Sequence, residues 1–170
     1  MLNKETTRLI NEQINKEFYS AYLYLGISSY YTSVNLNGFA NWFFVQTQEE
    51  RDHALLFVKY LQNNSEEVTL MDITASTEKY SDFARPLAAT LDHERIVTAS
   101  IGNIYASSMA LKDFRTMQFL DWFIKEQGEE EKNSEDLIRK YDLFGKDGKG
   151  LYMLDAELAT RVYMPPTLVI

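Results

Sequence analysis

Five side chains that could bind a metal ion recur at positions where a helix would bury them. A helix packed beside other helices buries residues spaced alternately three and four apart. That spacing places a carboxylate inside each of four mainly apolar stretches, and in the second stretch an imidazole follows the carboxylate three residues later. The five side chains are Glu17, Glu50, His53, Glu94 and Glu130. Carboxylates combined with a single imidazole suit a borderline cation such as iron or zinc.

The core-facing positions of each stretch otherwise carry residues that pack well. They are Ile10, Ile14, Glu17, Ala21, Tyr24, Ser28 and Tyr31; Phe39, Phe43, Gln46, Glu50, His53, Phe57 and Tyr60; Leu87, Leu91, Glu94, Thr98, Ile101 and Tyr105; and Leu120, Phe123, Gln127, Glu130, Ser134, Leu137 and Tyr141. A different register could also be drawn through the third stretch. In every stretch a carboxylate stands where an apolar residue would pack.

Four ionised carboxylates cannot stay unpaired in a core, because burial costs several kcal/mol per ion and the charges repel one another. Lys and Arg are absent from the core-facing positions, which leaves shared protons or metal ions as partners. Two Fe(II) ions would balance four carboxylates. The competing interpretation is a solvated helix face, which suits any single glutamate but not four glutamates at nearly matched depths.

The elements that position these residues are predicted to be helices, because the seven Gly and three Pro are few and mostly clustered. We predict long helices at about residues 5–34, 37–64, 84–112 and 115–142, and a short one near 151–161. Short joins make each pair of long helices an antiparallel hairpin. The predicted fold is all-α: a four-helix bundle in a single domain (residues 1–170), with one long crossover between the second and third helices and a short fifth C-terminal helix.

The polar segment from Ser65 to Arg85 is long enough to be this crossover. Ile73, Tyr80 and Phe83 favour packing along the outside of the bundle, and the alternative is a disordered loop. Hairpin geometry places Glu17 level with His53. It also places Glu94 about one helical turn, roughly 5 Å, from level with Glu130.

Several neighbouring residues have two interpretations. Tyr24 is either an aromatic filler of the core or a redox partner of the metals, and Trp122 is more often a core residue than a redox-active one. Glu49, Glu126 and Glu129 flank the candidate ligands and could form a peripheral cation site, although such glutamates are usually solvated. His93, next to Glu94, is expected at the surface or at an interface.

Composition and charge exclude several classes of partner and site. The formal net charge of -8, without a basic cluster, argues against nucleic-acid or anionic-membrane partners and is compatible with attracting cations. No stretch approaches the roughly 18 apolar residues of a membrane span, and MLNKETTRL lacks the apolar core of a signal peptide, so a cytoplasmic location is expected. The absence of Cys excludes disulfides and thiolate metal sites.

The sequence resembles the bacterial non-haem ferritins over nearly its whole length. The matching segments are NEQINKEFYSAYLYL around Glu17, QEERDH before and including His53, the His93-Glu94 pair, WFIKEQGEEEK around Glu130, and GKGLYMLDAELATR near the C-terminus. Inward-facing Glu and Glu-x-x-His ligands in a bundle with one long crossover are known for the wider ferritin-like class.

This resemblance implies Fe(II) oxidation with O2 or hydrogen peroxide and iron storage in a homo-oligomeric shell of 24 subunits. It implies that Glu17, Glu50 and His53 hold one iron and that Glu50, Glu94 and Glu130 hold a second, with Gln127 nearby. Glu49, Glu126, Glu129 and Glu130 correspond to a third iron site, and Tyr24 and Trp122 to aromatic residues beside the centre. The fifth helix is expected at a subunit junction. Bacterioferritins have a second Glu-x-x-His and a haem-ligating Met, where this chain has Gln127-x-x-Glu130 and Asp52, so no haem is expected.

Three other functions remain open at this stage. A non-storing di-iron oxidase or peroxidase would use the same ligands without a shell. A DNA-protecting ferritin-like protein would share its site between subunits, which the complete ligand set in one chain disfavours. A helical scaffold would bind no metal at all.

Overall fold

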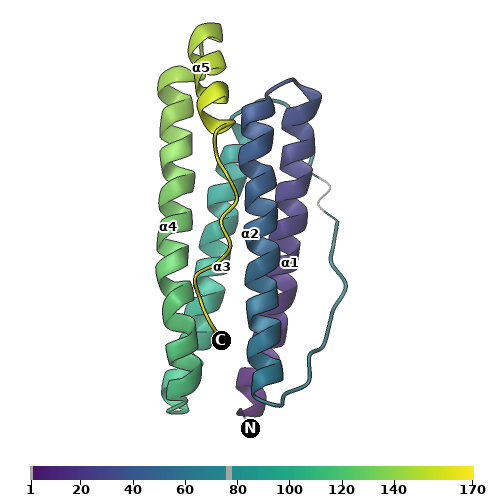
Figure 1. Ribbon diagram of the computed structural model, residues 1–170, viewed down its shortest axis with the longest axis vertical. Coiled ribbons are helices and arrows are strands. Elements are labelled where there is room, and N and C mark those ends of the chain that lie inside the picture. Colours follow the sequence, from purple (N-terminus) through teal and green to yellow (C-terminus); the bar gives the residue numbers. More distant parts are fainter. Residues whose placement is uncertain (1, 76–77) are drawn as a thin grey trace.

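Five helices make up the ordered elements of the part of the chain that the structure, a computed structural model, describes: residues 2–75 and 78–170. They are α1 (Lys4–Ser33), α2 (Asn37–Asn63), α3 (Arg85–Ala110), α4 (Phe114–Phe144) and α5 (Gly148–Leu158). The four long helices lie side by side, and α5 sits at one end of the bundle (Figure 1). The predicted all-α bundle with a crossover and a fifth helix is confirmed.

Two tight joins make the long helices antiparallel pairs. Each join contains one residue in the left-handed region, Asn35 (φ 60°) after α1 and Lys112 (φ 55°) after α3. In the first join the amide of Leu36 donates to the carbonyl of Tyr31 at 3.0 Å, which closes the end of α1. The chain therefore reverses within three residues, and α2 packs against α1 along its whole length.

Buried apolar side chains form two clusters along the bundle axis. The upper cluster, at the α5 end, includes Tyr24, Tyr31, Phe39, Phe43, Leu137, Leu154 and Leu158. The lower cluster includes Ile10, Ile14, Phe57, Leu61, Ile101, Ile104, Leu120 and Phe123. In each long helix the candidate glutamate falls between the residues of one cluster and those of the other. The two clusters thus enclose a polar layer from above and below.

The predicted core-facing positions are buried throughout α1 and α2. In α4 only Tyr141 is less buried than predicted. In α3 the register was wrong: the buried positions are Leu87, Thr90, Glu94, Val97, Ile101 and Ile104, whereas the predicted Leu91, Thr98 and Tyr105 are only partly buried. The stripe alternates three and four residues in the opposite order, which buries the apolar Val97 in place of Thr98. Glu94 belongs to both registers, so the error does not move it.

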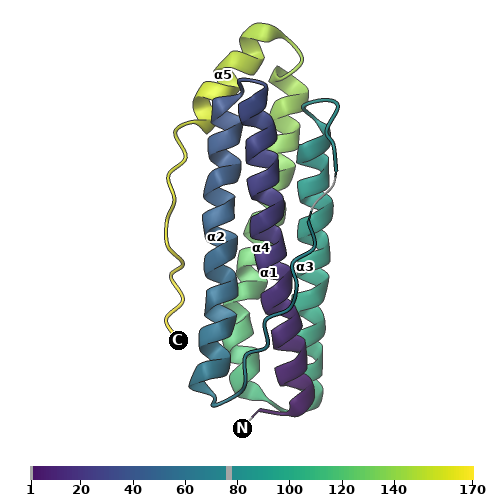
Figure 2. The ribbon, with the colours of Figure 1, turned by 90° about the vertical axis from the view of Figure 1, so that its right-hand side faces the viewer.

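The crossover between α2 and α3 runs past α1 toward the α5 end (Figure 2). Asn11 fastens its start, donating to the carbonyl of Glu67 at 3.1 Å and accepting from the amide of Thr69 at 2.7 Å. Tyr80 and Phe83 pack against the upper cluster as predicted. The prediction for Ile73 was wrong, because its side chain is 43% exposed. Residues 1, 76 and 77 lie outside the described residues.

The fifth helix begins three residues earlier than predicted, because Asp147 caps it by accepting from the amides of Lys149 and Gly150 at 3.0 Å each. Its Leu154 and Leu158 are buried in the upper cluster of their own chain. The position of this helix at a subunit junction stays a prediction.

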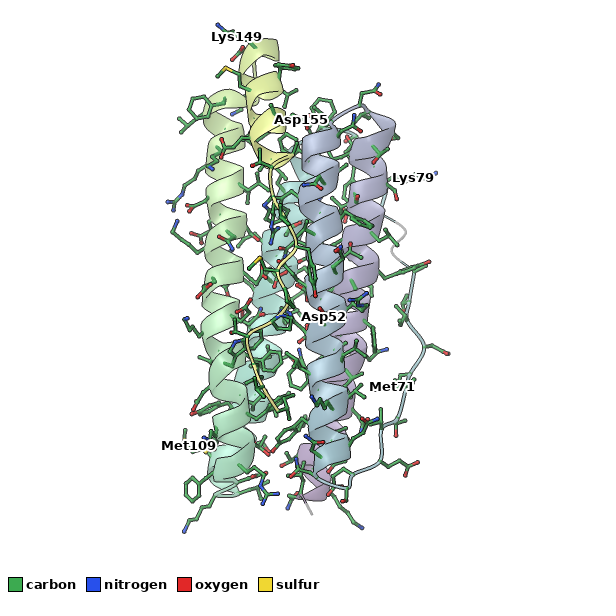
Figure 3. All side chains as sticks on the ribbon, in the orientation of Figure 1. Asp52, Met71, Lys79, Met109, Lys149 and Asp155 are labelled. Atoms are coloured by element: carbon green, nitrogen blue, oxygen red, sulfur yellow. The ribbon has the colours of Figure 1, made fainter. Side chains whose placement is uncertain are left out.

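The fifth helix also completes α2. Asp155 lies where α5 meets the start of α2 (Figure 3), and its Oδ1 accepts from the amides of Gly38 and Phe39 at 2.8 and 3.0 Å. The N-cap residue of α2, Leu36, has no side chain that could do this. A residue from α5 therefore caps α2.

No helix in the described part of the chain offers a stretch that is both long and apolar enough to cross a membrane.

The close packing of α5 against the start of α2 at Gly38 predicts a strong effect of one added methyl group. In a Gly38→Ala variant the new Cβ would lie 1.6 Å from the backbone oxygen of Asp155, so α5 must shift away from α2. We expect destabilisation of about 1–3 kcal/mol, measured by chemical denaturation. Gly26→Ala is the control, because its Cβ would meet nothing within 4 Å. Equal stability of the two variants would show that the contact is loose.

Candidate metal centre

The four candidate carboxylates lie together in the polar layer between the two apolar clusters. Glu17, Glu50, Glu94 and Glu130 are each at most 4% exposed, and His53 is 3% exposed. One ligand comes from α1, two from α2, one from α3 and one from α4. The layer is thus assembled from four helices of one chain.

Glu17, Glu50 and His53 form the tightest group. Each offers one ligand atom, and these three atoms lie within 4.8 Å of one another. The Nδ1 atom of His53 is 3.6 Å from Oε2 of Glu50. The prediction that Glu17 lies level with His53 is therefore confirmed. The spacing is short enough for one cation to contact all three residues.

The two carboxylate oxygens of Glu17 differ, because one accepts a hydrogen bond and the other has no donor. The amide of Gln13 donates to Oε1 of Glu17 at 2.8 Å, and the hydroxyl of Ser100 donates to the carbonyl of Gln13 at 2.6 Å. The other oxygen of Glu17, Oε2, is buried and has no hydrogen-bond partner. A buried carboxylate oxygen without a donor needs another partner, either a proton shared with the neighbouring Glu50 or a cation.

Glu94 is held at both oxygens. The hydroxyl of Tyr24 donates a hydrogen bond to Oε1, and the amide of Gln127 donates to Oε2 at 3.2 Å. Glu94 is thus level with Gln127, one turn from Glu130, which agrees with the hairpin geometry predicted from sequence. Burial and the Glu94 carboxylate raise the pKa of Tyr24 well above its usual value, so the phenol keeps its proton.

Glu130 completes the layer. The amide of Gln46 donates to its Oε2 at 2.9 Å, while its Oε1 has no such bond among the described residues. Three amide side chains, Gln13, Gln46 and Gln127, therefore hold one carboxylate each.

Electrostatics in the layer favour neutral carboxyl groups when no cation is present. Burial, followed by the carboxylates of Glu94 and Glu17, raises the pKa of Glu50 well above its usual value. Burial and the Glu94 carboxylate raise the pKa of Glu130 to about 8. The pKa values of Glu17 and Glu94 are raised as well, first by burial. A cation would reverse these shifts because it stabilises the ionised form.

The donor set fits a divalent cation. No Lys or Arg is among the buried side chains of the described residues, so no internal cation balances the four carboxylates. The free oxygen of Glu17 supplies a coordination position, and oxygen with one imidazole nitrogen suits iron or zinc.

A pocket of about 290 Å³ adjoins the layer between α2, α4 and the C-terminal tail. His53 and Trp122 line it together with Glu49, Glu126 and Glu129, the three residues predicted for a peripheral site. The structure brings these glutamates to one pocket, with Glu49 and Glu126 partly buried and Glu129 exposed.

Two aromatic residues near the layer, Trp122 and His93, are only partly buried and make polar contacts. Trp122 is partly buried, packs edge-on against His53 with ring centroids 5.6 Å apart, and donates to the hydroxyl of Thr167 at 3.2 Å. His93 was expected at the surface or at an interface. It is partly buried, 2.7 Å from the hydroxyl of Ser20, and burial lowers its pKa to about 4.

Comparison with known proteins shows which family has a similar sequence and fold. Residues 7–144 match the family described as a ferritin-like domain. A bacterial non-heme ferritin of Campylobacter jejuni is 36% identical over 155 residues, covering 91% of this chain and 93% of that protein. One from Staphylococcus epidermidis is 34% identical over 163 residues, covering 96% and 98%. This chain belongs to the ferritin family.

Solved ferritin structures agree with the fold. An open-pore ferritin from the archaeon Archaeoglobus fulgidus superposes with a TM-score of 0.93 at 36% identity and covers 95% of this chain and 100% of that chain. A humanized archaeal ferritin superposes with a TM-score of 0.95. The resemblance noted in the sequence is thereby confirmed.

Sequence reasoning missed the residues that hold the carboxylates of this ferritin. Gln13 precedes Glu17 by one turn, so the helical period could have indicated it. Gln46 was recognised as core-facing, although its bond to Glu130 was not. Ser100 and Arg161 gave no local signal, because their positions depend on contacts between distant segments.

The raised carboxyl pKa values predict a pH dependence for the metal-free ferritin. Carboxyl groups with raised pKa values stabilise the fold while protonated, and this contribution is lost as pH rises from the unfolded value of roughly 4.3 through about 8. We expect the melting temperature of the metal-free protein to fall over this range and divalent cations to abolish the fall.

A Glu130→Gln variant, which removes one of these groups, should show a shallower fall. A melting temperature independent of pH in the metal-free wild type would mean that the carboxyl groups are solvated.

Proposed function

We propose that this chain oxidises Fe(II) at the buried carboxylate layer and stores the Fe(III) product as a mineral inside a shell of identical subunits. The observation that carries the proposal is the burial of four carboxylates without a buried Lys or Arg in the described part of the chain. When its carboxyl groups are ionised, such a layer requires cations from outside, and the family relationship makes iron the relevant one.

Two Fe(II) ions are assigned to the layer as substrate. Glu17, Glu50 and His53 would hold the first, because their ligand atoms already lie within 4.8 Å of one another. Glu50, Glu94 and Glu130 would hold the second, with Glu50 bridging. The second iron would have only oxygen ligands, since all three of these residues are carboxylates. It should bind more loosely than the first, which suits iron in transit.

The layer favours oxidation because anionic ligands stabilise Fe(III) more than Fe(II). Each Fe(II) gives up one electron. O2 accepts both electrons with two protons and becomes hydrogen peroxide, or hydrogen peroxide accepts them with two protons and becomes two waters. Tyr24 is assigned a positioning role here, holding Glu94 through its hydroxyl.

The adjoining pocket is assigned to a third iron. Glu49, Glu126 and Glu129 line it. By the resemblance to bacterial non-haem ferritins, Glu130 would also contribute to this third site. His53 lines both the pocket and the layer, so an ion leaving the centre would meet these carboxylates next. We assign no haem, because Asp52 stands where haem-binding relatives have Met.

A shell of 24 subunits is proposed from the family relationship. Large apolar side chains exposed on α1 and α2 of the isolated subunit are consistent with contacts between subunits. They include Tyr22, Leu25, Phe44 and Leu55, which are 51%, 40%, 50% and 47% exposed.

The test is aerobic loading of metal-free protein with excess Fe(II), followed by size separation and measurement of iron per chain. We expect tens of irons per chain in a particle of several hundred kilodaltons. A Glu50→Ala variant should oxidise Fe(II) at least tenfold more slowly, because both irons lose a ligand. Glu135→Ala, which changes a partly exposed carboxylate of α4 outside the layer, is the control.

A plateau near two irons per chain in a small oligomer would overturn storage and leave a non-storing di-iron oxidase or peroxidase. No iron uptake at all would leave a helical scaffold.

A further inference from the structure

The C-terminal tail after α5 forms a strap over the candidate metal centre. Residues 159–170 run back from α5 along α2 and α4 (Figure 1) and pass Asp52, which accepts a hydrogen bond from Tyr163 (Figure 3). Leu168 and Ile170 pack against the lower apolar cluster. The strap thus spans from the upper cluster to the lower one and forms one wall of the pocket beside the centre.

One side chain of the strap, Arg161, is fixed beside Glu49, which lines the pocket. Its guanidinium lies 4.5 Å from the ring centroid of Trp42 and donates to the carbonyl of Trp42 at 3.3 Å. The same guanidinium donates to Glu49 at 2.6 Å and to the side-chain carbonyl of Gln46. Both members of the Arg161–Glu49 pair are mostly shielded, with side chains 22% and 18% exposed.

These contacts connect Arg161 to both proposed metal sites. Glu49 is one of the carboxylates of the pocket, and a guanidinium on its oxygen competes with a cation for the same charge. Gln46 keeps its amide nitrogen directed at Glu130, because Arg161 holds the carbonyl end. The effect of Arg161 on the inner layer is therefore indirect, whereas its effect on the pocket is direct.

We propose that Arg161 is a built-in counter-ion of Glu49 which an incoming cation must displace, so that the strap sets the affinity of the pocket for iron. The proposal rests on the proposed function, because it takes the pocket to be a third iron site. Displacement makes occupancy of the pocket weaker than its carboxylates alone would allow, and an iron there is released more easily as Arg161 returns.

The charge distribution supports this assignment. Glu129 pairs with Lys125 at 3.4 Å, but that pair is largely exposed and contributes little. Glu126 takes part in no ion pair among the described residues. Lys125 lines the pocket from an exposed position, whereas Arg161, outside the pocket lining, pairs with the lining residue Glu49 from a shielded position. Removing its charge should leave the three carboxylates free to bind a divalent cation.

The experiment is an anaerobic calorimetric titration of the metal-free assembled protein with Fe(II), compared between wild type and Arg161→Gln. We expect the first two equivalents to bind with unchanged affinity and the third to bind about tenfold more tightly in the variant. Arg139→Gln is the control for net charge, because it removes an exposed arginine of α4 with a side chain 69% exposed. It should leave all three affinities unchanged.

A Tyr163→Phe variant separates charge from anchoring. It removes the bond to Asp52 and keeps the guanidinium, so the third affinity should stay within about twofold of wild type. The proposal is overturned if Arg161→Gln leaves the third equivalent unchanged or weakens it, or if Tyr163→Phe tightens it equally. Failure of the proposed function would appear differently, as fewer than two tight equivalents in every protein.

Discussion

Four carboxylates share a buried layer that contains no lysine or arginine among the described residues. The rest of the molecule compensates for the free-energy cost of burying them. Ionised carboxylates in a core are unfavourable by several kcal/mol each, so the layer persists only when protons or cations neutralise it. The large aromatic clusters above and below it supply the apolar burial that keeps four helices together across this gap. A layer that is unfavourable alone and favourable with cations is suited to taking up metal ions.

Hydrogen bonds determine which carboxylate oxygens of that layer remain available to bind a cation. Gln13, Gln127 and Tyr24 occupy selected oxygens of Glu17 and Glu94, which fixes the orientation of those two carboxylates. One oxygen of Glu17 remains without a donor. The protein thus positions its carboxylates before any ion arrives, and little reorganisation is required on binding. The strap adds a cation at the outer edge of the site, where Arg161 meets Glu49.

The sequence predicted the fold and the candidate ligands well because both depend on helical periodicity and on short joins. Core-facing glutamates were identifiable on each helix, and the hairpin joins set the depth of Glu17 against His53. The register of α3 failed, because two apolar stripes overlap at Glu94 and Ile101 and sequence alone does not say which one packs. The positions of Ser100 and Arg161 depend on contacts between segments far apart in the chain. No local pattern encodes those contacts, so the hydrogen bonds around the carboxylates and the role of the strap came only from the structure.

The most direct test of the central claim is anomalous diffraction from crystals of the metal-free protein soaked anaerobically with Fe(II). Two strong iron peaks inside the bundle, about 3.5–4 Å apart and bridged by Glu50, are the predicted result. One peak should lie beside Glu17 and His53, and the other beside Glu94 and Glu130. Iron found only at the exposed glutamates, with the buried layer lacking anomalous signal, would contradict the claim that the carboxylates are buried to bind cations.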